Sequence, residues 1–157
     1  MKFNVRKNVF GLVALFLGVA ATLMLFLPAL IDIDSEAVYS GAQSVFGAQI
    51  YDLGPLGTVQ IEPSFLGIAA FLLPALAGLI ALLSKKGTIV SAALFIGATI
   101  LLFLLPTYTK TTLTLLGNTS VYETTWAMGW GLISAGVLSI LGVFVSLYVF
   151  MMSLRSE

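Results

Sequence analysis

The sequence predicts an all-α membrane protein: a bundle of four transmembrane helices with both termini cytoplasmic and a small β-prone extracytoplasmic region from the two outer loops. Three observations predict this class. Of the 157 residues, 59% are hydrophobic and 9% are charged, whereas soluble domains have roughly 25% charged residues. The apolar residues form four long runs. The charges lie between these runs and are separated by sign.

The first apolar run predicts a transmembrane helix over residues 9–31. It carries no charge, and about 20 apolar residues are enough to cross the hydrocarbon core of a bilayer. The basic residues before it (Lys2, Arg6 and Lys7) also fit the start of a signal peptide. The run is longer than the roughly 7–15 apolar residues of such peptides, so we expect an uncleaved span. Pro28 should end or bend its helix near the outer surface.

The first outer loop, residues 32–63, predicts a β-hairpin. The β-prone stretches "AQIYD" and "GTVQIE" flank the turn sequence "LGPLG", which is typical of paired strands. The preceding "EAVYSGAQSVFG" has two interpretations. It forms either a short amphipathic helix or a covered turn with Tyr39 and Phe46 packed on the sheet.

Three acidic residues alternate at the start of this loop: Asp32, Asp34 and Glu36. Carboxylates at alternate positions can bind Ca²⁺, but a loop of the EF-hand type needs Gly at position six and Glu at position twelve. Counting from Asp32, those positions hold Ala37 and Gln43. We therefore interpret the three acids as an outer surface where the chain re-enters water, and we expect no metal site.

The second and third runs predict spans over residues 64–84 and 88–106, joined by a short inner turn at 85–87. Pro74 lies near the middle of the second span. It cannot donate a hydrogen bond to the carbonyl of Ala70 and should kink the helix. The kink either shapes the bundle or serves as a hinge or cavity wall.

The second outer loop, residues 107–125, predicts another hairpin. The stretches "YTKTTLTLL" and "TSVYETT" flank "GN", and Thr, Val and Tyr favour strands. Both loops together therefore predict a small outer sheet. Asn118 begins a glycosylation sequon, which matters only if the chain follows a eukaryotic secretory route.

The last run predicts a span over residues 126–152, with Trp126 and Trp130 at the outer interface, where aromatic residues collect. Helices in lipid associate through small residues that let their backbones approach closely. The residues predicted to pack the helices in this way are Gly18, Gly97, Gly131, Ala135, Ser139 and Gly142.

The charge distribution predicts a multi-pass protein of the cell membrane with cytoplasmic N- and C-termini. If the four helices alternate in direction, six of the seven basic residues fall on the side of the termini and only Lys110 falls on the other. Basic residues in short loops stay cytoplasmic. The acidic residues on the outer side are Asp32, Asp34, Glu36, Asp52, Glu62 and Glu123.

The residues that are missing exclude several function classes. The chain has no Cys and no His, which removes thiol nucleophiles, disulfides, Cys/His zinc sites and imidazole catalysis. No Asp, Glu, Lys, Arg or His lies inside the four runs, which weighs against proton pumps, voltage sensors and carriers of charged substrates. We expect no enzymatic activity, no cofactor and no nucleic-acid partner.

The predicted layout resembles the claudin-like tetraspan arrangement in topology. The first outer loop has no Trp and the chain has no Cys, so the claudin signature W…G-L-W…C…C is missing and no residue role carries over. The pattern "FLP…YSG…FG", at residues 26–28, 39–41 and 46–47, also resembles small bacterial four-span proteins. That resemblance implies a fold and no activity.

These observations predict a non-enzymatic membrane scaffold or interaction protein that displays an acidic extracytoplasmic surface. Its expected partners are the lipid bilayer and either a second copy or another membrane protein, in a larger complex. The alternative is a channel or transport component for neutral or lipid-like cargo, which Pro74 and the hydroxyl side chains inside the spans suggest.

Overall fold

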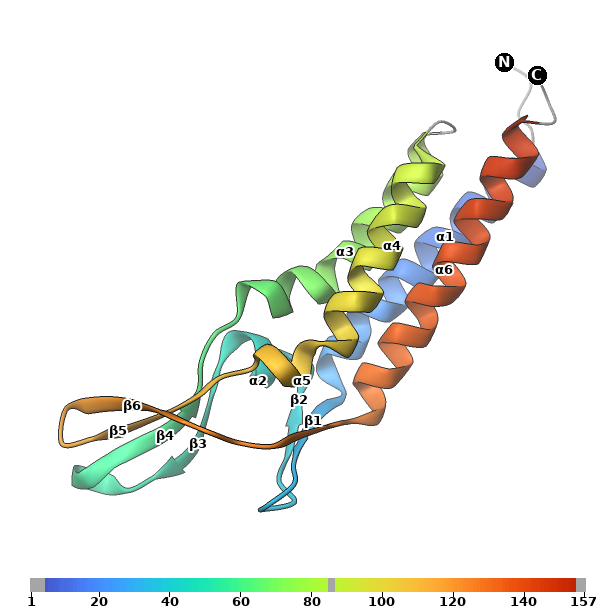
Figure 1. Cartoon of the computed structure of the whole chain (residues 1–157). Coiled ribbons are helices and arrows are strands. Elements are labelled where there is room, and N and C mark those ends of the chain that lie inside the picture. The colour runs from blue at the N-terminus through green and yellow to red at the C-terminus, as the bar shows by residue number, and fades with distance from the viewer. Residues whose placement is uncertain (1–4, 85–86, 155–157) are drawn as a thin grey trace.

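The computed structural model describes residues 5–84 and 87–154. Its four long helices are α1 (Val5–Leu23), α3 (Phe65–Leu83), α4 (Thr88–Phe103) and α6 (Trp130–Leu154). They lie side by side, with α1 and α4 each packed against both α3 and α6 (Figure 1). Two β-sheets lie at one end of the helices, which we call the sheet end (Figure 1). The start of α1, the end of α3, the start of α4 and the end of α6 lie at the opposite end (Figure 1).

The prediction of an all-α bundle of four transmembrane helices is wrong. The described residues form seven strands in two antiparallel sheets, so the fold combines α and β structure. Three helical stretches are long and apolar enough to cross a membrane, namely Val9–Phe26, Phe65–Leu83 and Trp130–Leu154. Helix α4 has 16 residues, which at 1.5 Å per residue is short of the roughly 30 Å hydrocarbon core. It ends before the single-turn helix α5 (Leu105–Tyr108), whose first turn contains Pro106.

The first sheet, which we call sheet A, corrects the predicted ends of two spans. Its strands β2 (Val38–Ser40), β1 (Pro28–Asp32) and β7 (Trp126–Met128) lie in that order. Residues 28–31 and 126–128 were expected to be helical but form strands. Leu30, Ile31 and Asp32 pair with Met128, Ala127 and Trp126. A short apolar run has the same composition in a buried strand as in a helix, so hydrophobicity alone extended both spans too far. Helix α1 ends at Leu23 and is followed by the 3-10 helix η1 (Met24–Phe26).

The second sheet, which we call sheet B, contains both predicted hairpins. Its order is β3 (Ala48–Asp52), β4 (Gly57–Ile61), β5 (Thr111–Leu115) and β6 (Asn118–Tyr122). The 3-10 helix η2 (Gly54–Leu56) connects β3 to β4. Pairing of β4 with β5 joins the two loops into one sheet.

The turn of the second hairpin lies one residue earlier than "GN" suggests. Its central residues are Leu116 and Gly117, with φ of 49° and 84°. Positive φ at both central residues is what a type I′ turn requires, and Asn-Gly is the preferred pair. Here Leu116 takes the position that Asn would favour, and Asn118 begins β6.

The segment before β3 combines a strand with a short helix, α2 (Gly41–Phe46). A capping box starts it: Ser40 Oγ accepts from the N–H of Gln43, and Gln43 Oε1 accepts from the N–H of Ser40. Tyr39 is buried in β2 with its ring edge-on to Trp126, at 5.6 Å between centroids. Phe46 is 57% exposed. The short helix therefore forms, while Tyr39 packs as the covered-turn interpretation expected.

One hydrophobic core connects the helices to sheet A. It contains large side chains from strands β1, β2, β4 and β7 and from helices α2, α3, α4, α5 and α6. Among them are Leu30, Tyr39, Val45, Phe71, Leu102, Leu105, Trp126 and Leu132. Sheet A is therefore fixed on the helix ends, while sheet B reaches this core through Ile61 and extends away from the helices (Figure 1).

Candidate functional site

Most of the predicted packing residues lie where two segments approach closely. A side chain on Gly18 would overlap the carbonyl oxygen of Pro74 in α3, and one on Gly142 would overlap the ring of Phe95 in α4. A Cβ on Gly131 would lie 2.7 Å from the carbonyl oxygen of Pro28. Ala135 and Ser139 are fully buried in α6; they are joined by a 2.9 Å hydrogen bond from Ser139 Oγ to the Ala135 carbonyl.

Gly97 and Pro74 differ from this group. A Cβ on Gly97 would have no atom within 4 Å, so this glycine does not lie at a contact between helices of the chain. Pro74 is buried inside α3, which continues through it from Phe65 to Leu83. Thr22 Oγ1 in α1 donates to the carbonyl of Phe71 at 2.6 Å. This bond joins α1 to α3 three residues before the proline, whereas the carbonyl that loses its usual helical donor is that of Ala70.

Several hydroxyl groups inside the helices are hydrogen-bonded to protein. Ser91 Oγ in α4 donates to the carbonyl of Ala77 in α3 at 2.7 Å and lies 3.0 Å from Ser146 Oγ in α6. Thr99 Oγ1 donates to the carbonyl of Phe95 in its own helix at 2.8 Å. These hydroxyl groups therefore join or stabilise helices. Their hydrogen bonds are made within the protein, so no polar cargo is needed to satisfy them.

The acidic residues predicted as an outer surface separate into two kinds. Asp34 and Glu36 are exposed, whereas Asp32 is only 6% exposed at the end of β1. The Asp32 carboxylate accepts from the Asp34 N–H at 3.1 Å and from Ser35 Oγ at 2.6 Å. Asp32 thus fixes the β1–β2 turn. In the described part of the chain, no group of three acidic, His or Cys side chains could hold a metal ion.

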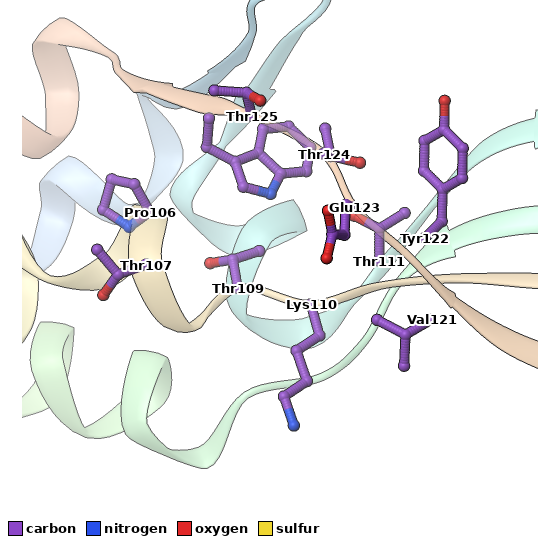
Figure 2. A pocket seen from close by; sticks show the side chains of 11 residues that line it. Pro106, Thr107, Thr109, Lys110, Thr111, Val121, Tyr122, Glu123, Thr124 and Thr125 are labelled. Atoms are coloured by element: carbon purple, nitrogen blue, oxygen red, sulfur yellow. The ribbon is translucent and has the colours of Figure 1, made fainter.

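A cleft of about 440 Å³ lies at the sheet end between α5 and strands β5, β6 and β7 (Figure 2). It is lined by Pro106, Thr111, Tyr122, Thr124 and Trp126, among others. No local sequence pattern indicates this cleft, because its walls come from both ends of the second outer loop. The repeated Thr residues in "TKTT" and "YETTW" were interpreted only as strand formers.

Three polar atoms at this cleft have no hydrogen-bond partner. They are Thr111 Oγ1, Thr124 Oγ1 and Trp126 Nε1, and they are all such buried side-chain atoms in the described part of the chain. Leaving a buried donor or acceptor unpaired costs about 1–3 kcal/mol. The neighbouring Thr107 and Thr109 avoid this cost by donating to the carbonyls of Leu104 and Leu105. The unpaired atoms therefore mark this cleft as a candidate binding site.

Two opposite charges flank the same cleft. Lys110 and Glu123 both line it, and Figure 2 shows the Lys110 side chain extending away from the Glu123 carboxylate. Tyr108 is close in sequence, where its hydroxyl donates to the carbonyl of Leu101 at 2.9 Å. Burial raises the pKa of Tyr108 to about 12, so it remains neutral at physiological pH. The charged groups next to the unpaired atoms are thus Lys110 and Glu123.

The far end of sheet B carries a cluster of exposed leucines, which we call the tip leucines. They are Leu53, Leu56, Leu115 and Leu116, with exposures of 44%, 60%, 40% and 78%. The N–H of Leu116 donates to the carbonyl of Leu56 at 3.0 Å, which holds the two turns together. Both turns lie at the end of sheet B farthest from the helices (Figure 1).

In comparisons with known proteins, no family model, curated protein or solved structure matches this chain.

Proposed function

We propose that the chain is a non-enzymatic membrane protein whose helices lie in the cell membrane and whose sheet end binds a membrane-protein partner on the extracytoplasmic side. The outer faces of the helices support the membrane placement. Phe16, Leu83 and Phe144 are 72%, 75% and 65% exposed. Burying one such side chain in an apolar medium is worth about 1.5–3 kcal/mol, so lipid suits these faces better than water.

The charge distribution supports an orientation with both termini cytoplasmic. Asp34, Glu36, Asp52 and Glu123 are exposed at the sheet end, and the start of α1 and the end of α6 lie at the opposite end (Figure 1). The basic residues that predict the cytoplasmic side are Arg6 and Lys7, in α1, and Lys2, Lys85, Lys86 and Arg155, which lie outside the described residues, as does Glu157.

The tip leucines are the observation that carries the interaction role. Leu116 holds a left-handed φ of 49°, which is unfavourable for a residue with a large side chain. This strained position carries an apolar side chain that is 78% exposed. Asn or Gly would adopt the same turn with less strain. Asp52 lies beside the cluster at the end of β3. A partner with an apolar pocket and a basic rim fits this surface.

The helix interior supports interaction over transport. Its buried hydroxyls on Ser91, Ser139 and Ser146 are satisfied within or between helices. A path for cargo needs polar groups that face an open route.

Photo-crosslinking in native membranes tests this proposal. A photoreactive residue at Leu116 should give a specific adduct with another membrane protein, identified by mass spectrometry. The matched control is the same residue at Gln49, which is exposed on β3 of the same sheet but is not a tip leucine. The variant Leu116→Asn should abolish the adduct formed from a photoreactive residue at Leu56, while the fold remains intact because Asn tolerates left-handed φ.

Three outcomes of the crosslinking would contradict the proposal. The first is equal adducts at Leu116 and Gln49, and the second is only lipid adducts at Leu116. The third is an adduct from Leu56 that survives Leu116→Asn. An adduct between two copies of the chain would show that the partner of the tip leucines is a second copy of the chain and not a different membrane protein.

A further inference from the structure

Two of the three unpaired atoms of the cleft belong to side chains that are almost fully buried, and the third belongs to the half-buried Thr124. Thr111 and Trp126 are only 1% and 8% exposed, and Thr124 Oγ1 is buried beside them. The indole N–H can only donate, and each hydroxyl can donate one hydrogen bond. The cleft therefore offers three donors directed at no acceptor of the chain, and the Lys110 ammonium adds a fourth donor at its edge.

The two charges at the cleft restrict what can complete it. A simple anion would satisfy the donors but would be repelled by Glu123, and a neutral polyol would leave both charges without a counter-charge. A molecule that joins an anionic acceptor group to a cation satisfies both requirements. Charge-assisted hydrogen bonds of this kind are stronger than neutral ones.

We infer that this cleft binds a zwitterionic phosphate ester with the chemistry of phosphoethanolamine. Its phosphate oxygens accept hydrogen bonds from Trp126 Nε1, the hydroxyls of Thr111 and Thr124, and Lys110. Its ammonium group lies against the Glu123 carboxylate. A volume of about 440 Å³ lies within the usual range for small-ligand sites.

The position of the cleft allows two sources for this group. Pro106 and Thr107, just beyond α4, line it, so in the proposed membrane placement it lies at the level of the lipid head groups. This assignment of a lipid source rests on the proposed function, whereas the recognition chemistry does not. A soluble ester of phosphoethanolamine carries the same groups.

Binding requires a small local rearrangement. Each of the three unpaired atoms is shielded from solvent, so the two threonine side chains must rotate and the Trp126 ring must shift to present their donors to a ligand. Side-chain rotations are fast compared with ligand exchange. The rearrangement also predicts that Thr111→Val, which removes an unpaired hydroxyl, raises the thermal midpoint of the ligand-free protein while weakening binding.

Nuclear magnetic resonance of the indole N–H groups provides the test. The full chain in uncharged maltoside micelles is titrated with short-chain phosphatidylethanolamine, with short-chain phosphatidylglycerol and with soluble glycerophosphoethanolamine. The variant Trp126→Phe assigns the Trp126 resonance, and Trp130, which is 56% exposed, is the internal reference. We expect a saturable shift of the Trp126 resonance with phosphatidylethanolamine.

Two variants of the cleft should weaken this binding. Thr111→Val and Glu123→Gln should each weaken the affinity for phosphatidylethanolamine about fivefold or more, as expected for loss of one hydrogen bond or charge contact. Thr119→Val on the exposed strand β6 should leave it unchanged.

Each result decides the inference. A shift with both the lipid and the soluble ester supports recognition of the head group alone, and a shift with the lipid only supports a membrane source. Equal binding of phosphatidylglycerol, or no shift with any compound, would overturn it; in the second case water alone satisfies the three atoms. Because purified protein is used, failure here leaves the crosslinking result standing, and loss of the crosslinked partner leaves this site standing.

Discussion

At the scale of single residues, glycines determine how closely the helices approach. Gly18 and Gly97 were predicted to play the same part, yet Gly18 lies against the α3 backbone and Gly97 has open space around it. Sequence spacing identifies small residues in a helix, but it does not show which way each one faces. The residues that each glycine contacts therefore could not be predicted from the sequence.

This difference gives a matched pair of variants. Gly18→Ala should destabilise the protein by about 1–3 kcal/mol, because the new methyl group would overlap the Pro74 carbonyl in a well-packed contact. Gly97→Ala should be neutral or stabilising by up to about 1 kcal/mol, because Ala favours helix and meets no atom. Unfolding of both variants in mixed micelles measures the change. Equal destabilisation by the two would contradict the assigned helix contacts.

Tyr108 predicts a pH dependence at the alkaline end. Burial raises its pKa to about 12 from the ordinary value of 10.0. The folded protein therefore keeps the proton that the unfolded chain releases between pH 10 and pH 12, so the stabilising contribution is complete below pH 10 and is lost as the pH rises through 12. Titration of the phenolate absorbance should show one tyrosine ionising near pH 12, and Tyr108→Phe should remove that component. Its persistence in the variant would show that the assignment is wrong.

At the scale of elements, turn signals and β-prone stretches predicted more than hydrophobic runs did. Both hairpins of sheet B follow from β-prone stretches around Gly-containing turns, and both are present. Strands β1 and β7 were missed because "PALID" and "WAM" continue apolar runs. Their pairing joins segments about 100 residues apart, and no local pattern reports a contact of that kind. The cleft was missed for the same reason.

The capping box of α2 gives a prediction at this scale. Ser40→Ala removes the side-chain acceptor for the Gln43 N–H and should cost about 1 kcal/mol of stability. Gln43→Ala removes the reciprocal bond to the Ser40 N–H and should cost a similar or smaller amount. The two effects should not add, because both residues belong to one motif. A double-mutant cycle measured by thermal unfolding checks this, and strict additivity would contradict the cooperative cap.

At the scale of the whole molecule, the polar and apolar parts of the chain are separated along its length. The helices present apolar outer faces, and the sheet end carries the exposed acidic residues, the cleft and the tip leucines. Composition and charge distribution predicted this separation from the sequence. They did not predict the β-structure of sheet A or the shortness of α4, because both depend on where an apolar segment pairs and ends.

Thiol accessibility measures the central claim most directly. The chain has no Cys, so each introduced cysteine reports one position. Ser120 on β6 and Ser84 after α3 are both exposed serines, at the sheet end and the opposite end. In intact cells, a membrane-impermeant maleimide should label Ser120→Cys fully and should label Ser84→Cys only after the membrane is opened. Labelling of Ser84→Cys in unbroken cells, or recovery of the protein as a folded monomer without detergent, would contradict the membrane placement and its orientation.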